Sequence, residues 1–377
     1  GLLRLKNAGR KKTKMRDDRI NVLQIVGNAR IGGVAACLLN YYRHSDLSGF
    51  RFDFVTYAPS SFDEEVLKTD PHARIYYISP FQHNFIKGIF DLEKVCADND
   101  YKIVHSHLTT LSAFALTPAA HSAVPIRICH AHSAFDRYSD HYLFKKMLRP
   151  FACDKATHLM ACSRYAAENL FGKRAGEAYI LPNAIEGSRF YSEEKQYAQY
   201  RRELGLEGKV VLFVGRFEYQ KDIPLLVRAF ATASKKQEMT LVLVGDGKER
   251  HTIIEEISSC GIAGKVKIIP PCDPAPWYKA ADIFCLPSRY EGLGMVAIEA
   301  QAAGLKCLLS VNVPKEADIT GKCKFIDGGV EQWAAALLEP AAHSYDTRQC
   351  IEKAHYEITQ EAHRLTDFYE NALRELR

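Results

Sequence analysis

Two carboxylates stand close together in the stretch SRYEGLGMVAIEA, residues 288–300, where Glu291 and Glu299 lie eight residues apart. On a single helix, eight residues at about 100° each would leave them roughly 80° apart and about 12 Å along the axis. The apolar run DIFCLP predicts a strand before the first glutamate, and MVAIEAQAAG predicts a short helix around the second. Glu291 is therefore expected on a loop and Glu299 on a helix. Gly292 and Gly294 would leave backbone N–H groups open to an anion between them.

Two cations, Arg216 and Lys221, follow the strand-like run VVLFVG five residues apart. A guanidinium fork and an ammonium on one loop suit a diphosphate, although two solvated cations are the alternative. Gly33 opens an amphipathic segment soon after the first strand-like run, NVLQIV. Bare backbone at a helix start lets an anion approach, and a helix-packing turn is the alternative there.

Histidines gather in HSH, residues 105–107, and in HAH, residues 130–132, each at the end of a strand-like run. An imidazole there could position or polarise a hydroxyl, and a structural role is equally open. A zinc site formed by these histidines is an alternative, but no carboxylate or cysteine at ligand spacing accompanies them, and we predict no metal site. The D-x-D pair Asp98 and Asp100 precedes a strand, the wrong end of a parallel sheet for a ligand, and indicates a turn.

These residues must be positioned by the short apolar runs that alternate with helix-like segments. The first half contains NVLQIV, RFDFV, RIYYI, KIVHSH, RICHA and THLMAC, and the second VVLFVG, TLVLVG, KVKII, DIFCLP and LKCLLS. Such runs are typical of buried parallel strands with crossover helices. The predicted fold class is α/β, with two doubly wound, Rossmann-like domains facing a cleft.

The domain boundary is expected near the irregular, polar segment YILPNAIEGSRFYSEEKQ. We predict a disordered basic arm over residues 1–19, a first Rossmann-like domain over 20–178 and a second over 179–345. The tail, 346–377, has apolar residues at helical spacing and is expected to form helices that pack back on the first domain. The chain's 377 residues, 47% of them hydrophobic, suffice for two packed domains.

The eleven cysteines form an odd set without a C-x-x-C pair, which favours buried thiols in a reducing compartment. We therefore expect a cytoplasmic protein. No apolar run approaches the ~18 residues of a membrane span. The basic arm and HYLFKKMLRPF, residues 141–151, would suit contact with the anionic inner face of a membrane, whereas a solvated arm and an ordinary amphipathic helix are the alternatives. The net charge of +5 is mild, and we predict no nucleic-acid partner.

Together these motifs resemble those of the retaining glycosyltransferases of family 4, which share the two-domain GT-B fold. PSRYEGLGMVAIEAQAAG looks like the family's E-x7-E signature, and VGRFEYQKD looks like its G-R-x4-K segment. GGVA looks like its N-terminal glycine loop, and AHS, residues 131–133, looks like its first-domain histidine motif. The resemblance runs from about Asn21 into the tail. Within the family, the chain is most similar to enzymes of capsular and exopolysaccharide biosynthesis.

The resemblance implies that residues of both domains hold a nucleotide-sugar donor: Gly33, Arg216, Lys221, Gly292, Leu293, Gly294 and Glu299. Within this set, Arg216 and Lys221 would hold the diphosphate, and Glu299 would accept hydrogen bonds from the ribose. Glu291, with the glycine-loop N–H groups, would hold the donor sugar. His132 would hydrogen-bond that sugar near the reacting carbon. Glu291 and His132 are therefore the predicted catalytic residues.

The function that the resemblance implies is retaining transfer of a hexose from a UDP-sugar to a glycan or lipid-linked acceptor in surface polysaccharide biosynthesis. Fixed cations would stabilise the leaving diphosphate, so no metal cofactor is expected. The chain departs from the family at PPCDPAPW, residues 270–277, where a Gly-x-Arg-like loop usually contacts the base. The alternatives are a nucleotide-sugar epimerase of the same fold and a non-catalytic partner that binds nucleotide-sugars.

Overall fold

The computed structural model describes residues 18–29, 33–132 and 142–376. The predicted basic arm therefore lies outside the described residues, except for its last two positions. Gly32 of the GGVA motif and Ser133 of the AHS motif also lie outside them. Gly33 and His132 are described, as are all the other predicted site residues.

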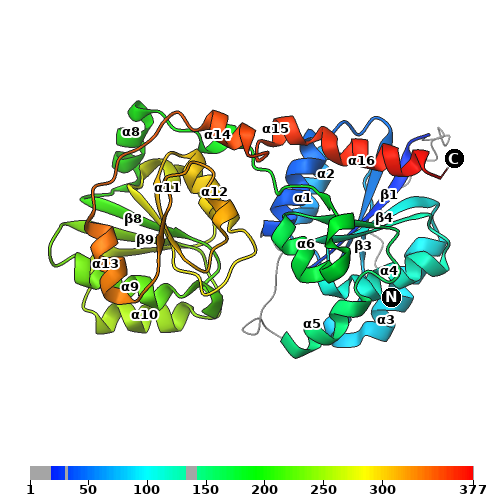
Figure 1. The fold of residues 1–377 in the computed structure, drawn as a ribbon, viewed down its shortest axis with the longest axis horizontal. Coiled ribbons are helices and arrows are strands. Elements are labelled where there is room, and N and C mark those ends of the chain that lie inside the picture. The colour runs from blue at the N-terminus through cyan, green and yellow to red at the C-terminus, as the bar shows by residue number, and fades with distance from the viewer. Residues whose placement is uncertain (1–17, 30–32, 133–141, 377) are drawn as a thin grey trace. The chain divides into compact units, whose positions relative to one another are not determined.

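Packing divides the chain into two units. Unit 1 comprises residues 1–184 and 358–377, and unit 2 comprises residues 185–357 (Figure 1). Each unit is a parallel sheet with helices on both faces. None of the described helices combines the length and the apolarity that a bilayer-spanning segment needs.

Unit 1 contains a seven-stranded parallel sheet in the order β3-β2-β1-β4-β5-β6-β7. Its strands are β1 (Ile20–Gly27), β2 (Phe50–Thr56), β3 (Ile75–Tyr77), β4 (Tyr101–Ser106), β5 (Ile126–Ala131), β6 (His158–Ala161) and β7 (Tyr179–Ile180). Strand order reverses between β1 and β4, the switch point of a doubly wound sheet. All except β7 overlap an apolar run that the sequence offered, because strands buried on both faces read as continuous apolar runs.

The helices of unit 1 cover both faces of this sheet. They are α1 (Gly33–His44), α2 (Ser61–Thr69), α3 (Phe81–Ala97), α4 (Ser112–His121), α5 (Tyr142–Leu148), α6 (Arg164–Phe171), α15 (Ile358–Glu361) and α16 (His363–Arg374). Helices α1, α2 and α16 share one apolar core with the sheet, whereas α3, α4 and α6 share the other. Successive strand residues alternate between the two cores: Val22 lies in the first and Leu23 in the second.

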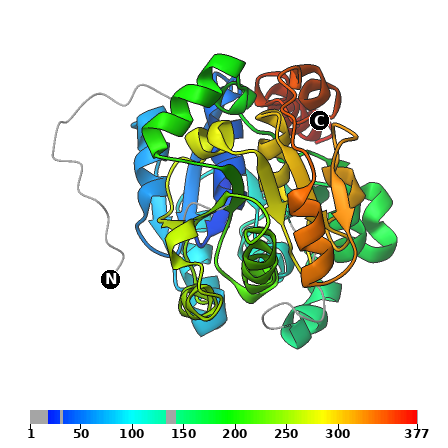
Figure 2. The same cartoon turned by 90° about the vertical axis from the view of Figure 1, so that its left-hand side faces the viewer.

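Unit 2 contains a six-stranded parallel sheet in the order β10-β9-β8-β11-β12-β13 (Figure 2). Its strands are β8 (Lys209–Val214), β9 (Met239–Val244), β10 (Val266–Ile269), β11 (Ile283–Leu286), β12 (Lys306–Ser310) and β13 (Lys324–Ile326). Its helices are α7 (Gly187–Phe190), α8 (Glu194–Leu204), α9 (Ile223–Ala233), α10 (Arg250–Ser259), α11 (Ala275–Ala280), α12 (Met295–Ala302), α13 (Val330–Leu338) and α14 (Arg348–Lys353). The switch point lies between β8 and β11. The prediction of two doubly wound parallel α/β units is confirmed.

The C-terminal segment belongs to both units. Helix α14 lies in unit 2, whereas α15 and α16 lie in unit 1. In unit 1, the Tyr369 ring of α16 packs edge-on against the rings of Phe50 and Phe52 on β2, with centroid distances of 5.6 and 6.0 Å. These contacts place the Tyr369 hydroxyl over the sheet, beside strands that carry buried polar side chains.

Candidate functional site

The predicted site residues follow the carboxyl ends of strands at the two switch points or, for β5, one strand beyond. In unit 2, Arg216 follows β8 and Glu291 follows β11, and these two strands are neighbours. In unit 1, Gly33 follows β1, and His132 follows β5. Ligands of open α/β sheets bind outside the carboxyl ends of the strands at such a point. The fold thus gives each unit its own group of candidate residues at the expected edge of its sheet.

In unit 2, Lys221 and Glu291 form an ion pair that joins the loop after β8 to the loop after β11. Both side chains are largely buried, with exposed fractions of 13% and 7%. Ser288 Oγ donates to Glu291 Oε1 at 2.7 Å, and Gln220 Nε2 donates to the Tyr290 carbonyl oxygen at 2.8 Å. These bonds hold the Glu291 carboxylate in one orientation, and removing either ion would leave its partner buried and uncompensated.

Arg216 is exposed, and its side chain has no hydrogen bond or ion pair with the described residues. Its loop is held instead by the loop after β9: Phe217 N donates to the Asp246 carbonyl at 2.8 Å, and Glu249 N donates to the Phe217 carbonyl at 2.9 Å. A Cβ on Gly245 would lie 1.9 Å from the Gly215 carbonyl oxygen. The GDG sequence therefore serves close backbone packing that supports the loop of Arg216.

The glycine loop before α12 presents backbone donors. The N–H groups of Gly292, Leu293 and Gly294 have no acceptor among the described residues. Gly294 has φ 84°, a left-handed conformation that favours glycine, and precedes the first helical residue, Met295. The start of a helix adds a partial positive charge, so this loop is suited to an anion or to the oxygen atoms of a sugar.

Glu299 lies in α12, as predicted, and is half-buried. The Tyr278 hydroxyl donates to Glu299 Oε2 at 3.0 Å. Burial raises the pKa of Glu299 to about 7, although the hydrogen bond from Tyr278 acts in the opposite direction. This carboxyl group therefore changes its charge near neutral pH, a property common among groups at functional sites.

In unit 1, His132 is buried and both of its ring nitrogens have protein partners. Its Nε2 lies 2.7 Å from His107 Nδ1, and its Nδ1 lies 3.3 Å from Asn183 Oδ1. Burial lowers the pKa of His132 to about 4, with the hydrogen bond to Asn183 acting in the opposite direction. The imidazole is therefore neutral at physiological pH, and it can offer a hydroxyl either a lone pair or an N–H.

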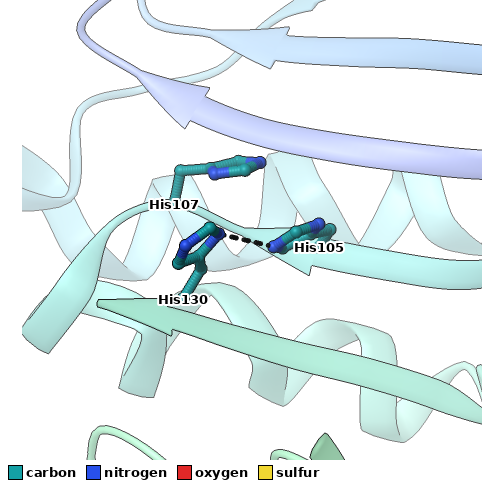
Figure 3. Close-up of side chains that lie close together, drawn as sticks. All are labelled: His105, His107 and His130. Carbon is teal, nitrogen blue, oxygen red and sulfur yellow. Dashed lines mark hydrogen bonds between the residues drawn. The ribbon is translucent and has the colours of Figure 1, made fainter. Parts of the chain in front are cut away.

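Three further histidines, His105, His107 and His130, lie close together in unit 1 (Figure 3). His105 Nε2 lies 3.1 Å from His130 Nδ1, and one ring nitrogen from each of the three can be chosen so that all lie within 4.8 Å of one another. The rings are stacked rather than aimed at one point: the His105 ring lies 28° from the His107 plane and 16° from the His130 plane. Lone pairs lie in the ring plane, so this arrangement favours a hydrogen-bonded core over a metal centre.

Gly33 is the first residue of α1, and it is exposed. A Cβ added there would meet no atom of the described residues within 4 Å. The position is therefore not required for packing against the described residues, unlike Gly245. Open space at a helix start leaves room for a ligand to approach the backbone.

Sequence reasoning missed several side chains that hold the predicted ones. They are Gln24, Asn183, Gln220, Tyr278, Ser288 and Tyr369. Asn183 lies in the segment that was interpreted only as an irregular domain boundary, yet its side chain lies beside His132. Gln24 is fully buried within the apolar run NVLQIV, and that isolated amide was the one sequence signal available for it.

Comparisons with known families match both parts of the chain. Residues 31–189 match the family described as Glycosyltransferase Family 4, and residues 197–355 match Glycosyl transferases group 1. EpsF of Bacillus subtilis (strain 168), named as a glycosyltransferase, is 26% identical over 357 residues, covering 90% of this chain and 92% of EpsF.

Solved structures share the fold. Sucrose-phosphate synthase from Thermosynechococcus elongatus superimposes with a TM-score of 0.78 at 20% identity, covering 95% of this chain and all of that one. HepE from Anabaena, in complex with UDP-glucose, gives a TM-score of 0.73 at 16% identity, with coverages of 95% and 99%. The predicted GT-B fold is thereby confirmed, and the chain belongs to the glycosyltransferases in which a Family 4 region is followed by a group 1 region.

Proposed function

We propose that the chain is a retaining hexosyltransferase that moves a sugar from a UDP-sugar to a glycan or lipid-linked acceptor in surface polysaccharide biosynthesis. The observation that carries the proposal is the group of charges at the switch point of unit 2. Arg216 is exposed and has no side-chain partner in the described part of the chain, and it lies on the same loop as Lys221, whose ammonium is paired with Glu291. A diphosphate beside this loop would meet one available guanidinium and one ammonium already fixed in place.

In the proposed reaction, the two cations stabilise the negative charge that develops on the leaving diphosphate. The acceptor oxygen forms a bond to the anomeric carbon while the bond from that carbon to the diphosphate breaks, and the electron pair leaves with the phosphate oxygen. The acceptor proton passes to the departing phosphate on the same face of the sugar, which retains the anomeric configuration. Negative charge grows on the diphosphate in the transition state, where Arg216 and Lys221 stabilise it without a metal ion.

The remaining residues are proposed to hold the donor along its length. Glu299 accepts hydrogen bonds from the ribose hydroxyls, which requires its ionised form. Glu291, with the unpaired N–H groups of the glycine loop, holds the sugar hydroxyls. In unit 1, Gly33 contributes bare backbone to the donor phosphates or sugar, and His132 hydrogen-bonds the sugar near the reacting carbon. Uridine is the proposed base, and the UDP-glucose bound to HepE supports this choice by fold likeness.

The experiment that tests this function separates it from the two alternatives. A panel of nucleotide-sugars is screened by thermal shift, because a ligand at 100 times its Kd adds ~2.7 kcal/mol of stability. Donors that bind are then incubated without an acceptor. Release of UDP would support a transferase that slowly hydrolyses its donor, with water as the acceptor. An isomerised donor would indicate an epimerase. Binding without any turnover on a panel of acceptors would indicate a non-catalytic partner.

We propose further that unit 1 works at an anionic membrane surface, on the cytoplasmic side. The predicted interfacial segment, described from Tyr142 onward, forms α5 and the turn after it. Its apolar side chains are exposed: Leu143, Phe144, Met147 and Phe151. Lys145 and Lys146 alternate with them, as in helices that lie in a lipid headgroup layer.

Helix α3 adds a second exposed apolar face, formed by Phe85, Ile86 and Phe90. Helices α3 and α5 both lie along the lower edge of unit 1 in Figure 1. Leu143 and Ile86 are 78% and 69% exposed, and clustered exposure of this kind marks interaction surfaces in soluble proteins. The basic residues of α5 favour an anionic lipid surface over a neutral one.

Vesicle sedimentation tests the membrane proposal independently of catalysis. We expect the protein to sediment with phosphatidylglycerol vesicles at low salt and to remain in solution with phosphatidylcholine vesicles. The variants Ile86→Ser and Leu143→Ser should weaken sedimentation, whereas Ile254→Ser, an exposed apolar change on α10 of unit 2, should not. Unchanged sedimentation of the unit 1 variants, or a dimer in light scattering that these variants abolish, would overturn it.

A further inference from the structure

A continuous series of hydrogen bonds joins the C-terminal helix of unit 1 to His132. The Tyr369 hydroxyl on α16 lies 2.9 Å from Gln24 Nε2, and Gln24 Oε1 lies 2.8 Å from His107 Nε2. His107 Nδ1 in turn lies 2.7 Å from His132 Nε2. The backbone explains this meeting, because alternation along β1 places Gln24 on the same side of the sheet as Val22, the side that α16 covers.

The series has a second branch that ends inside the core. The Tyr369 hydroxyl also lies 2.7 Å from His105 Nδ1, and His105 Nε2 lies 3.1 Å from His130 Nδ1. The remaining nitrogen, His130 Nε2, is buried and has no partner among the described residues. Burial lowers the pKa of His105, His107 and His130 well below the usual histidine value, so each ring is neutral and carries a single proton.

With neutral rings, the Gln24 amide fixes the direction of every bond in the series. Gln24 Nε2 donates to Tyr369, and Gln24 Oε1 accepts from His107 Nε2. His107 Nδ1 then has a lone pair, so it accepts the proton of His132 Nε2, and His132 Nδ1 is left with a lone pair. Turning the amide by 180° would reverse each of these bonds and move the His132 proton to Nδ1.

Asn183 favours the opposite arrangement. Its Oδ1 faces His132 Nδ1 at 3.3 Å, and an acceptor oxygen there prefers a proton on Nδ1. With both amide groups oriented as they are in the structure, the two oxygens could be satisfied at once only if His107 and His132 shared an extra proton, which burial opposes. The bonds on the Gln24 side are shorter, at 2.7 and 2.8 Å, so the Gln24 side is expected to prevail.

We infer that Gln24 and Tyr369 are positioning residues, which act through His107 to keep the proton of His132 on Nε2 and a lone pair on Nδ1. The inference rests on the proposed role of His132 at the donor sugar, and it says what that ring offers. With a lone pair on Nδ1, His132 accepts a hydrogen bond from a sugar hydroxyl. The contact with Asn183, the longest in the series, is the one that such a hydroxyl would replace.

The cost of these buried groups supports a role beyond packing. Gln24 is completely buried in a strand whose neighbouring residues are apolar. Burying an amide, a phenol and four imidazoles is costly unless they satisfy one another, and an apolar core would be simpler to build. Even so, one nitrogen of His130 has no partner within residues 18–29, 33–132 and 142–376. A need to fix the tautomer of the His132 ring would account for this costly set of buried polar groups.

Nitrogen-15 NMR of the histidine side chains in the ligand-free protein tests the inference. The two ring nitrogens of a neutral imidazole differ in shift according to which one carries the proton, and His132→Gln assigns the His132 signals. We expect an Nε2–H tautomer in the wild-type protein. Tyr369→Phe frees the Gln24 amide to turn, and Gln24→Met removes that amide. In both variants we expect the hydrogen bond to Asn183 Oδ1 to decide the tautomer, so that the His132 proton moves to Nδ1.

The control is Tyr101→Phe, which removes another buried hydroxyl of unit 1, donated to Asp53 Oδ2 at 2.8 Å, and leaves the histidine series intact. It should keep the wild-type tautomer and the wild-type kcat, whereas Tyr369→Phe should lower kcat about tenfold, as for one lost hydrogen bond. The same His132 tautomer in the wild type and both test variants would overturn the inference. Normal turnover of His132→Ala would instead refute the proposed role of His132 and leave the tautomer result standing.

Discussion

The Lys221 ammonium contacts the Glu291 carboxylate across two loops of unit 2, at the edge of the sheet where its strand order reverses. The two residues are seventy positions apart in the chain. This pair gives the candidate site a fixed internal charge balance before any donor arrives. In the proposed site, Lys221 would be shared between this carboxylate and a diphosphate, whereas the Arg216 side chain has no partner among the described residues.

The first prediction concerns Lys221 of that ion pair, together with Glu299 of α12. Lys221→Ala and Glu299→Ala should each lower kcat/KM by at least ~100-fold, because a lost polar contact to a charged group costs ~1.5–3 kcal/mol or more. Lys221→Met should also destabilise the fold, because it leaves Glu291 buried without its partner. Steady-state kinetics and urea unfolding measure the two effects separately.

A matched control exists at the other end of the same sheet. Arg201 pairs with Asp282 at 3.0 Å, and both side chains are similarly buried, but Asp282 precedes β11 instead of following it. Arg201→Met should therefore destabilise the fold and leave kcat/KM nearly unchanged. Equal losses of activity in Arg201→Met and Lys221→Met would show that stability alone explains both.

The second prediction follows from the raised pKa of Glu299, about 7. Only the ionised carboxylate accepts both ribose hydroxyls, so KM for the donor should rise as the pH falls from 8 to 6. Ionisation is disfavoured in the folded state, so its cost to stability is present above the pKa and fades below it. Glu299→Gln should thus raise Tm at pH 8 more than at pH 5.5 and remove the pH dependence of KM. A KM that is flat over this range in the wild type would contradict the assignment.

The third prediction uses the empty space around Gly33. Gly33→Ala introduces a methyl group that meets no described atom within 4 Å, and alanine favours the helix, so Tm should stay the same or rise. If the donor approaches this backbone, KM for the donor should increase several-fold. An unchanged KM would remove Gly33 from the donor site.

The fourth prediction separates packing glycines from ligand-binding ones. Gly245→Ala places a methyl group 1.9 Å from the Gly215 carbonyl oxygen and should destabilise unit 2 by ~1–3 kcal/mol, as overpacking does. Gly264→Ala, where no atom lies within 4 Å, is the control and should be nearly neutral. Chemical denaturation gives both values, and a fully stable Gly245→Ala protein would refute the packing role of the GDG sequence.

Much of the fold could be predicted from the sequence, because buried parallel strands consist of continuous apolar runs. The prediction of Glu291 on a loop and Glu299 on a helix also held, because the glycines and the apolar run fix where α12 begins. The edge strands β7 and β13 were missed, because β7 has only two residues and β13 contains only two apolar residues between polar neighbours. A polar segment containing Tyr179 and Ile180 was consequently interpreted as irregular.

The contacts within the site could not be predicted in the same way. Gln24 and Tyr369 are 345 residues apart, and the bond between them depends on α16 returning to the sheet of unit 1. Local spacing carries no information about such a meeting. His132 was predicted from its motif, and no local pattern indicated that both of its ring nitrogens would already have protein partners.

The most direct test of the central claim follows the first product formed from the donor by proton NMR. The protein is incubated with an α-linked UDP-hexose that it binds, without an acceptor, so that water takes the acceptor's place. The account predicts that UDP and the free hexose appear together and that the hexose is the α-anomer before mutarotation. Initial release of the β-anomer, or conversion of the donor to another UDP-sugar without release of UDP, would contradict it.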